Sequence, residues 1–203
     1  MRSRGRKRLV LAVVAALAVV AAVAGGVALA GGGDKPPPGV SAGVSALTRL
    51  PPQAHVPDNV AWFVTFESKA TGTDPAKALK GVRLLRQNLG VAHADVYAFK
   101  NAAGSPCFLL TGDSGTCARS PSAGTSGLHW TIGGGDAQRP SSLVGIASDD
   151  VSQVQLTVDG AQVPISLENN VAFGEFPQGH QHATIVVVHR DGTQSTADVN
   201  LQG

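Results

Sequence analysis

A Gly-Asp-Ser-Gly motif at 112–115 lies between Cys107 and Cys117, the two cysteines of the chain, in a pattern that serine proteases use around their nucleophile. That chemistry also needs a histidine base and an aspartate that orients it. The nearest upstream histidine, His93, is too close to Ser114 for a folded β-barrel to fit between them. Glycine, aspartate and serine are also preferred turn residues. We therefore interpret Ser114 as a turn residue and predict that the chain has no catalytic residue.

Histidines form a second set of candidates. His180 and His182 would point to one face of an extended segment, a geometry that metal ions accept. A third ligand is needed, and His189 or Glu175 could supply it only if folding brought either one close. Because proline and glycine precede the pair, an exposed turn is the favoured interpretation. We predict no metal ligand and no bound cofactor.

The remaining polar motifs fit structural roles. Asp149 and Asp150 are adjacent at a predicted turn, so their side chains should diverge and not form the carboxylate pair of a glycosidase. His129 lies in a predicted strand and is expected to be half-buried. The glycine clusters at 31–33 and 133–135 lack the spacing of phosphate-binding loops.

The N-terminus carries the signals for export. Residues 1–8 are strongly basic, and Leu9–Ala30 contains no charged or polar side chain. A helix over 9–30 would be roughly 33 Å long, which is enough to cross a bilayer. The basic flank stays in the cytoplasm, so the following chain should be extracytoplasmic. We predict a retained transmembrane signal-anchor in the cell membrane; the alternative is a signal peptide, with secretion after cleavage near Ala30.

Charge and composition divide the exported part. It carries 11 of the 16 Lys/Arg and all 14 Asp/Glu, a formal charge of −3, and therefore lacks the electrostatic footprint of a nucleic-acid-binding protein. Residues 31–57 are rich in glycine and proline, which predicts a disordered stalk. Residues 58–203 are enough for one extracytoplasmic domain.

Export would place Cys107 and Cys117 in an oxidising compartment, where paired thiols form disulfides. The residues between them predict a strand followed by a turn, which would bring the two sulfurs together across a hairpin. Their even separation permits direct opposition only with an odd number of turn residues or with a bulge. Two free thiols, or half of a zinc site, are the alternatives, although two cysteines alone make a poor zinc site. We predict a Cys107–Cys117 disulfide.

The elements that would position these residues are mostly strands. Residues 59–66 predict an edge strand or a docked arm, and Asp74-Pro75 begins a predicted helix that ends at Gly90. Short β-branched runs then alternate with turn signals, and Asp159-Gly160 and Asp191-Gly192 predict hairpins. The expected fold is mainly β, an antiparallel β-sandwich or partly open barrel with one short N-terminal helix, preceded by the transmembrane helix and the stalk.

The order of these features is similar to that of a known group. A leucine-rich helix, a DVYAF strand and a cysteine-containing hairpin precede a glycine-rich stretch, a VGIASDDVSQVQL segment, a DG hairpin and NNVAFGEF. Over residues 75–203 the chain resembles uncharacterised exported, single-pass membrane-anchored β-domain proteins of high-GC Gram-positive bacteria. The resemblance implies no activity, cofactor or catalytic residue.

These observations favour a non-catalytic, membrane-anchored extracytoplasmic β-domain that interacts with an unidentified envelope protein or with the cell wall. Residues 9–30 would contact the membrane. One alternative is an envelope hydrolase whose site is assembled from scattered residues, which a deep pocket with convergent ionisable groups would favour. The other is a structural or sensory envelope element, which a broad exposed apolar patch would favour.

Overall fold

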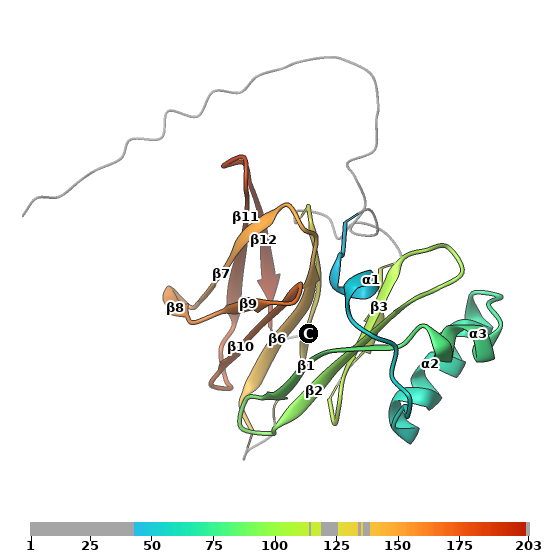
Figure 1. The fold of residues 1–203 in the computed structure, drawn as a ribbon. Helices are drawn as coiled ribbons and strands as arrows, with labels where there is room; N and C mark the ends of the chain where they lie inside the picture. Colours follow the sequence, from blue (N-terminus) through green and yellow to red (C-terminus); the bar gives the residue numbers. More distant parts are fainter. Residues whose placement is uncertain (1–42, 114, 119–125, 134, 136–138, 202–203) are drawn as a thin grey trace, which may run out of the picture. The chain divides into compact units, whose positions relative to one another are not determined.

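The structure is a computed structural model, and it describes residues 43–113, 115–118, 126–133, 135 and 139–201 (Figure 1). This part of the chain is mainly β, with antiparallel sheets as predicted, and it carries three short helices where one was expected. The segments 1–8 and 9–30 lie outside the described residues. Within the described residues, no helix is both long enough and apolar enough to span a bilayer.

The strands form three four-stranded sheets. The first sheet has the order β1-β2-β3-β4, with β1 (Arg83–Leu89), β2 (Ala94–Lys100), β3 (Pro106–Leu110) and β4 (Gly115–Cys117). The middle sheet has the order β5-β6-β10-β9, with β5 (Leu128–Gly133), β6 (Ser141–Ala147), β10 (Val171–Phe176) and β9 (Ser166–Glu168). The third sheet has the order β12-β11-β7-β8, with β12 (Gln194–Asn200), β11 (His182–His189), β7 (Val151–Val158) and β8 (Ala161–Val163).

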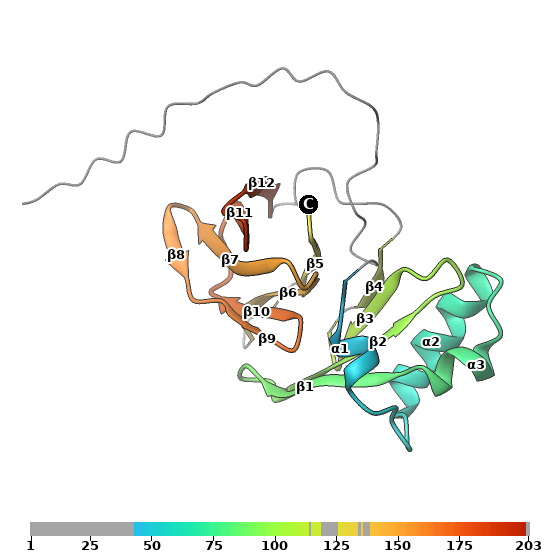
Figure 2. The same ribbon diagram turned by 45° about the horizontal axis from the view of Figure 1, so that its top comes forward.

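The middle sheet is covered on both faces (Figure 2). Along β10, Val171 and Phe173 belong to the core shared with the first sheet, whereas Ala172 and Phe176 belong to the core shared with the third. The nearly continuous burial of β6 and β10 is what a sheet with two covered faces requires. Strands β7 and β11 largely alternate between buried and more exposed positions, which is the period-2 pattern of a sheet with one core face.

The outer face of the first sheet is covered by helices, the first of which is α2 (Asp58–Ala70) (Figure 1). The strand predicted over 59–66 is therefore wrong. Val60, Phe63 and Val64 recur at helical spacing and are buried in one cluster with side chains of β2 and β3. A short apolar run does not by itself distinguish a strand from a helix, and here the sheet beneath it selects the helix.

The second covering helix, α3 (Pro75–Lys80), begins as predicted and ends early. The Asp74 carboxylate accepts a hydrogen bond of 3.0 Å from a backbone N–H of the first turn, as an N-cap should. The helix stops at Lys80 instead of Gly90 because the next residues form β1. Leu85 and Leu89 are both buried on β1, and a spacing of four residues places two side chains on one face of a helix and also on one face of a strand.

The folded domain begins before residue 58. Helix α1 (Ala46–Arg49) packs into the core between the first and middle sheets, and Val44 and Leu47 are only 5% and 6% exposed. The structure therefore differs from the prediction in the second half of the stalk assigned to 31–57. Apolar residues spaced among prolines can dock onto a core that already exists, although they could not build one alone. Residues 31–42 lie outside the described part.

Both predicted hairpins are confirmed. Asp159 and Gly160, with φ angles of 44° and 84°, join β7 to β8, and the Asp191-Gly192 turn joins β11 to β12. The AQVPISL run forms two strands instead of one, because Pro164 cannot donate a ladder hydrogen bond. The chain passes at this proline from the third sheet into the middle sheet.

Candidate functional site

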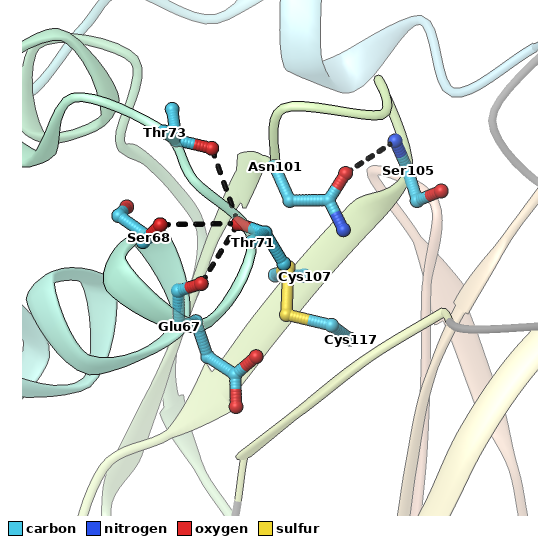
Figure 3. The surroundings of a disulfide bond; sticks show 8 residues. All are labelled: Glu67, Ser68, Thr71, Thr73, Asn101, Ser105, Cys107 and Cys117. Atoms are coloured by element: carbon cyan, nitrogen blue, oxygen red, sulfur yellow. Dashed lines mark hydrogen bonds between the residues drawn. A yellow bond between two sulfur atoms is a disulfide. The ribbon is translucent and has the colours of Figure 1, made fainter.

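The predicted disulfide is confirmed (Figure 3). Cys107 and Cys117 are direct cross-strand partners on β3 and β4, and their sulfurs are 2.01 Å apart. Leu109 and Gly115 form the last pair before the turn, so 110–114 is the odd-numbered connection that direct opposition requires. Neither cysteine is a free thiol or a zinc ligand.

The disulfide is buried beneath α2. Cys107 and Cys117 are 0% and 5% exposed and share a cluster with Phe63. Beside them Thr71 Oγ1 donates to the carbonyl of Glu67 at 2.8 Å and closes the end of the helix (Figure 3). A disulfide this inaccessible stabilises the hairpin and offers little redox chemistry, because exchange requires access to the sulfurs.

The turn that follows β3 is tied to the middle sheet. Asp113 donates its backbone N–H to the carbonyl of Leu110 at 3.2 Å, and its carboxylate accepts a 3.1 Å hydrogen bond from Ser142 Oγ on β6. This side chain therefore joins two sheets that are separate in the sequence. Ser114 lies outside the described residues, so its role in the turn stays a prediction.

His180 and His182 both contact the Asp159 carboxylate, the first through its ring and the second through its backbone. His180 Nδ1 lies 2.9 Å from Asp159 Oδ2, whereas His182 is exposed and donates its backbone N–H to the same carboxylate. Glu175 accepts a hydrogen bond of 3.0 Å from a backbone N–H, and His189 belongs to another network. The described residues contain no group of three or more His, Cys, Asp or Glu side chains that could hold a metal ion.

Three residues that the sequence analysis did not combine form a Ser-His-Asp relay. Ser126 Oγ is 3.0 Å from His189 Nε2, and His189 Nδ1 is 2.9 Å from Asp150 Oδ2. Ser126 precedes β5, Asp150 lies in the turn between β6 and β7, and His189 ends β11. The two contacts match the order of nucleophile, base and orienting acid in hydrolases. No local sequence motif contains these residues, so only the fold could bring them together.

Gly127 allows the turn before β5 to pack closely against the His189 imidazole. It has a φ of 79°, and a Cβ there would lie 2.9 Å from Cε1 of His189. A side chain at this position would therefore be both strained and obstructed. Ser126 is held on its other side as well, because its backbone N–H donates to Ser195 Oγ at 3.0 Å.

The exposure of Asp150 differs from that of the aspartate in a hydrolase, whereas Ser126 is partly exposed. The His189 side chain is 9% exposed and the Asp150 side chain is 59% exposed, whereas a hydrolytic triad buries its aspartate and leaves its serine open to substrate. Hydrogen bonds from Ser148 and His189 lower the pKa of Asp150 below its ordinary value against the opposing effect of burial. An ionised Asp150 fixes the orientation of the His189 ring. The relay can therefore act as a structural link between the ends of β5, β7 and β11, a role that needs no proton transfer.

Asp149 has other partners than Asp150, as predicted for two adjacent aspartates at a turn whose side chains diverge. Its carboxylate accepts hydrogen bonds from the backbone N–H and the hydroxyl of Ser45 and from Nδ2 of Asn170, at 2.8–3.1 Å. Burial opposes ionisation, yet the bonds from Asn170 and Ser45 and the charge of Arg190 keep the pKa of Asp149 below its ordinary value. The carboxylate thereby holds the start of α1 on the turn between β6 and β7.

A polar cavity of about 410 Å³ lies beside this contact. Arg49 Nη2 donates to Asn169 Oδ1 at 3.0 Å, and Arg190 Nε donates to the backbone carbonyl of Asp149 at 2.8 Å. Ser148, Ser152 and Glu168 also line it. Guanidinium, carboxylate, amide and hydroxyl groups in one concave surface are suited to a polar or charged ligand.

Two other surface features are more apolar than the cavity beside α1. A cavity of about 440 Å³ has Trp130, Phe176 and His180 in its wall. On α2, Trp62 and Phe66 are 68% and 54% exposed, and their rings stack with centroids 5.6 Å apart. Exposed stacked aromatics are a common component of protein interaction surfaces.

No protein-family model, curated protein or solved structure matches this chain.

Proposed function

We propose that the protein is a non-catalytic extracytoplasmic β-domain, tethered to the cell membrane through residues 9–30, that binds an envelope protein or a cell-wall polymer. The observation that carries this proposal is the polar cavity beside α1. Its arginines and Asp149 are held by hydrogen bonds within the protein. Side chains that are already ordered lose less conformational entropy when a ligand binds.

The position of the cavity in the chain supports a role close to the membrane. The carbonyl of Gly43 accepts a hydrogen bond from the backbone N–H of Asp149, and Ser45 forms part of the cavity wall. Residues 31–42 would separate this point from the predicted membrane segment by at most about 47 Å. The proposed tether would therefore keep the cavity near other envelope components and raise their effective concentration.

Site-specific photo-crosslinking in intact cells tests the proposal. A photo-crosslinking residue replaces Ser152, which is exposed at the cavity, or Gln162, which is exposed on β8 and serves as the control. We expect a discrete adduct with an envelope component from position 152 and none from position 162. No adduct from position 152, or equal adducts from both positions, would count against a binding site at the cavity.

The Ser126–His189–Asp150 relay is the observation that favours a second candidate function, an envelope hydrolase with a site assembled from scattered residues. A fluorophosphonate probe requires an activated serine beside an oxyanion hole. The first proposal predicts that the full-length protein stays unlabelled. Labelling that disappears in Ser126→Ala and in His189→Gln would instead establish the hydrolase.

A further inference from the structure

The cavity beside α1 brings two positively and two negatively charged side chains together. Its charged lining residues are Arg49, Asp149, Glu168 and Arg190. Both oxygens of Asp149 already accept hydrogen bonds from neutral donors, as described above. Glu168 forms an ion pair of 3.5 Å with Arg86, which is not part of the cavity lining. Among the described residues, neither acidic group forms an ion pair with an arginine of the cavity.

The two cavity arginines have neutral hydrogen-bond partners. Arg49 donates to an amide oxygen and Arg190 to a backbone carbonyl. Ion pairs within the described part of the chain are Arg86–Glu168, His180–Asp159 and His189–Asp150. Each guanidinium has five N–H donors and is oriented by the bond it makes, so further donors stay available for a ligand.

We propose that this cavity binds an oxyanion, a carboxylate or phosphate group, through Arg49 and Arg190. The inference rests on the proposed binding function and names the chemical class of its ligand. Arginine recognises both anions by charge-assisted hydrogen bonds. Neither guanidinium forms an ion pair among the described residues, so both can offer charged donors to an anion that enters the cavity. The hydroxyls of Ser148 and Ser152 in the same wall would suit a polymer that also carries hydroxyl groups.

Binding is measured by NMR on the ¹⁵N-labelled full-length protein in detergent micelles. The probes are inorganic phosphate, glucuronate as a sugar carboxylate, and glucose as the uncharged comparison, each added at millimolar concentration. We expect saturable shifts of the backbone amide signals of Asp149 and Asn170 with at least one anion and none with glucose. A response to phosphate alone assigns the site to phosphate-bearing ligands, and a response to glucuronate alone assigns it to carboxylates.

Variants test whether the two arginines are responsible. Arg49→Gln and Arg190→Gln should each weaken anion binding by at least about tenfold, because each removes a charged hydrogen-bond donor. Lys69→Gln removes an exposed positive charge on α2, away from the cavity lining, and should leave the affinity unchanged. The guanidinium of Arg49 bonds only to the Asn169 side chain among the described residues, so its variant should keep the fold even if Arg190→Gln does not.

Two results would overturn the inference. One is the absence of a saturable shift with either anion, and the other is equal weakening by Arg49→Gln and Lys69→Gln. If anion binding fails while position 152 still crosslinks to an envelope component, the binding function survives and only the ligand class is wrong. If the anion binds but position 152 gives no adduct, the envelope function fails and the anion site stands.

Discussion

His129 should make the domain sensitive to acid. It lies on β5 with 8% of its surface exposed, more buried than the sequence predicted, and its ring meets Phe108 edge to face at a centroid distance of 5.6 Å. Its Nε2 is buried and has no hydrogen-bond partner among the described residues. Burial lowers the pKa of His129 to about 4 from an ordinary value of 6.5, because no nearby group compensates the desolvated charge.

The sign and size of the effect follow from this difference in pKa. Above pH 6.5 the ring is neutral in both the folded and the unfolded chain, and its contribution to stability is complete. As the pH falls, the unfolded chain takes up the proton first, so the free energy of unfolding decreases until the pH drops below the folded pKa. The loss is about 2 kcal/mol at pH 5 and about 3 kcal/mol at pH 4.

Urea unfolding at pH 7, 5 and 4 measures this loss. His129→Leu removes the titration and should lose about 2–3 kcal/mol less stability than the wild type between pH 7 and pH 4. His182→Leu alters an exposed histidine and should follow the wild type. All three proteins share the carboxylates and His189, so any contribution of these groups to the pH dependence of stability cancels in the comparison. Parallel pH profiles for the wild type and His129→Leu would refute the reasoning.

Three further outcomes are expected. Cys117→Ala should lower the free energy of unfolding by about 2–4 kcal/mol, and alkylation of both thiols in the native exported protein would contradict the disulfide. Asp149→Ala should increase amide hydrogen exchange over 44–47 and lower stability by about 1–3 kcal/mol, because Ser45 loses the carboxylate that holds α1; unchanged exchange there would show that apolar packing alone holds α1. Protease added to intact cells should remove the C-terminal domain and spare a short N-terminal fragment, whereas full-length protein in the cytosolic fraction would disprove the topology.

Strands and turns could be predicted from the sequence where neighbouring residues alone decide the backbone conformation. The Asp159-Gly160 pair supplies the left-handed conformations that a tight hairpin needs, and no other part of the chain has to cooperate. The alternation of Val154, Leu156 and Val158 on β7 likewise reflects a single core face. The Cys107–Cys117 pairing followed from one hairpin and the even spacing of its cysteines.

Predictions failed where one pattern permits two structures. The run at 59–66 has apolar residues that serve either a strand or a helix, and contact with the first sheet selected α2. The spacing of Leu85 and Leu89 fits one face of a helix and equally one face of a strand, and pairing with β2 selected the strand. Such choices depend on long-range partners, which local propensity does not describe.

The sequence by itself determined the mainly β class, the two hairpins and the disulfide, because each depends on neighbouring residues and on backbone sterics. Only the tertiary structure decided that Ser126, Asp150 and His189 meet, and that Arg49 and Arg190 line one cavity. These residues lie on segments far apart in the chain, and side-chain contacts between such segments are set by sheet order and packing. The candidate sites of this protein therefore arise from its topology and not from any local motif.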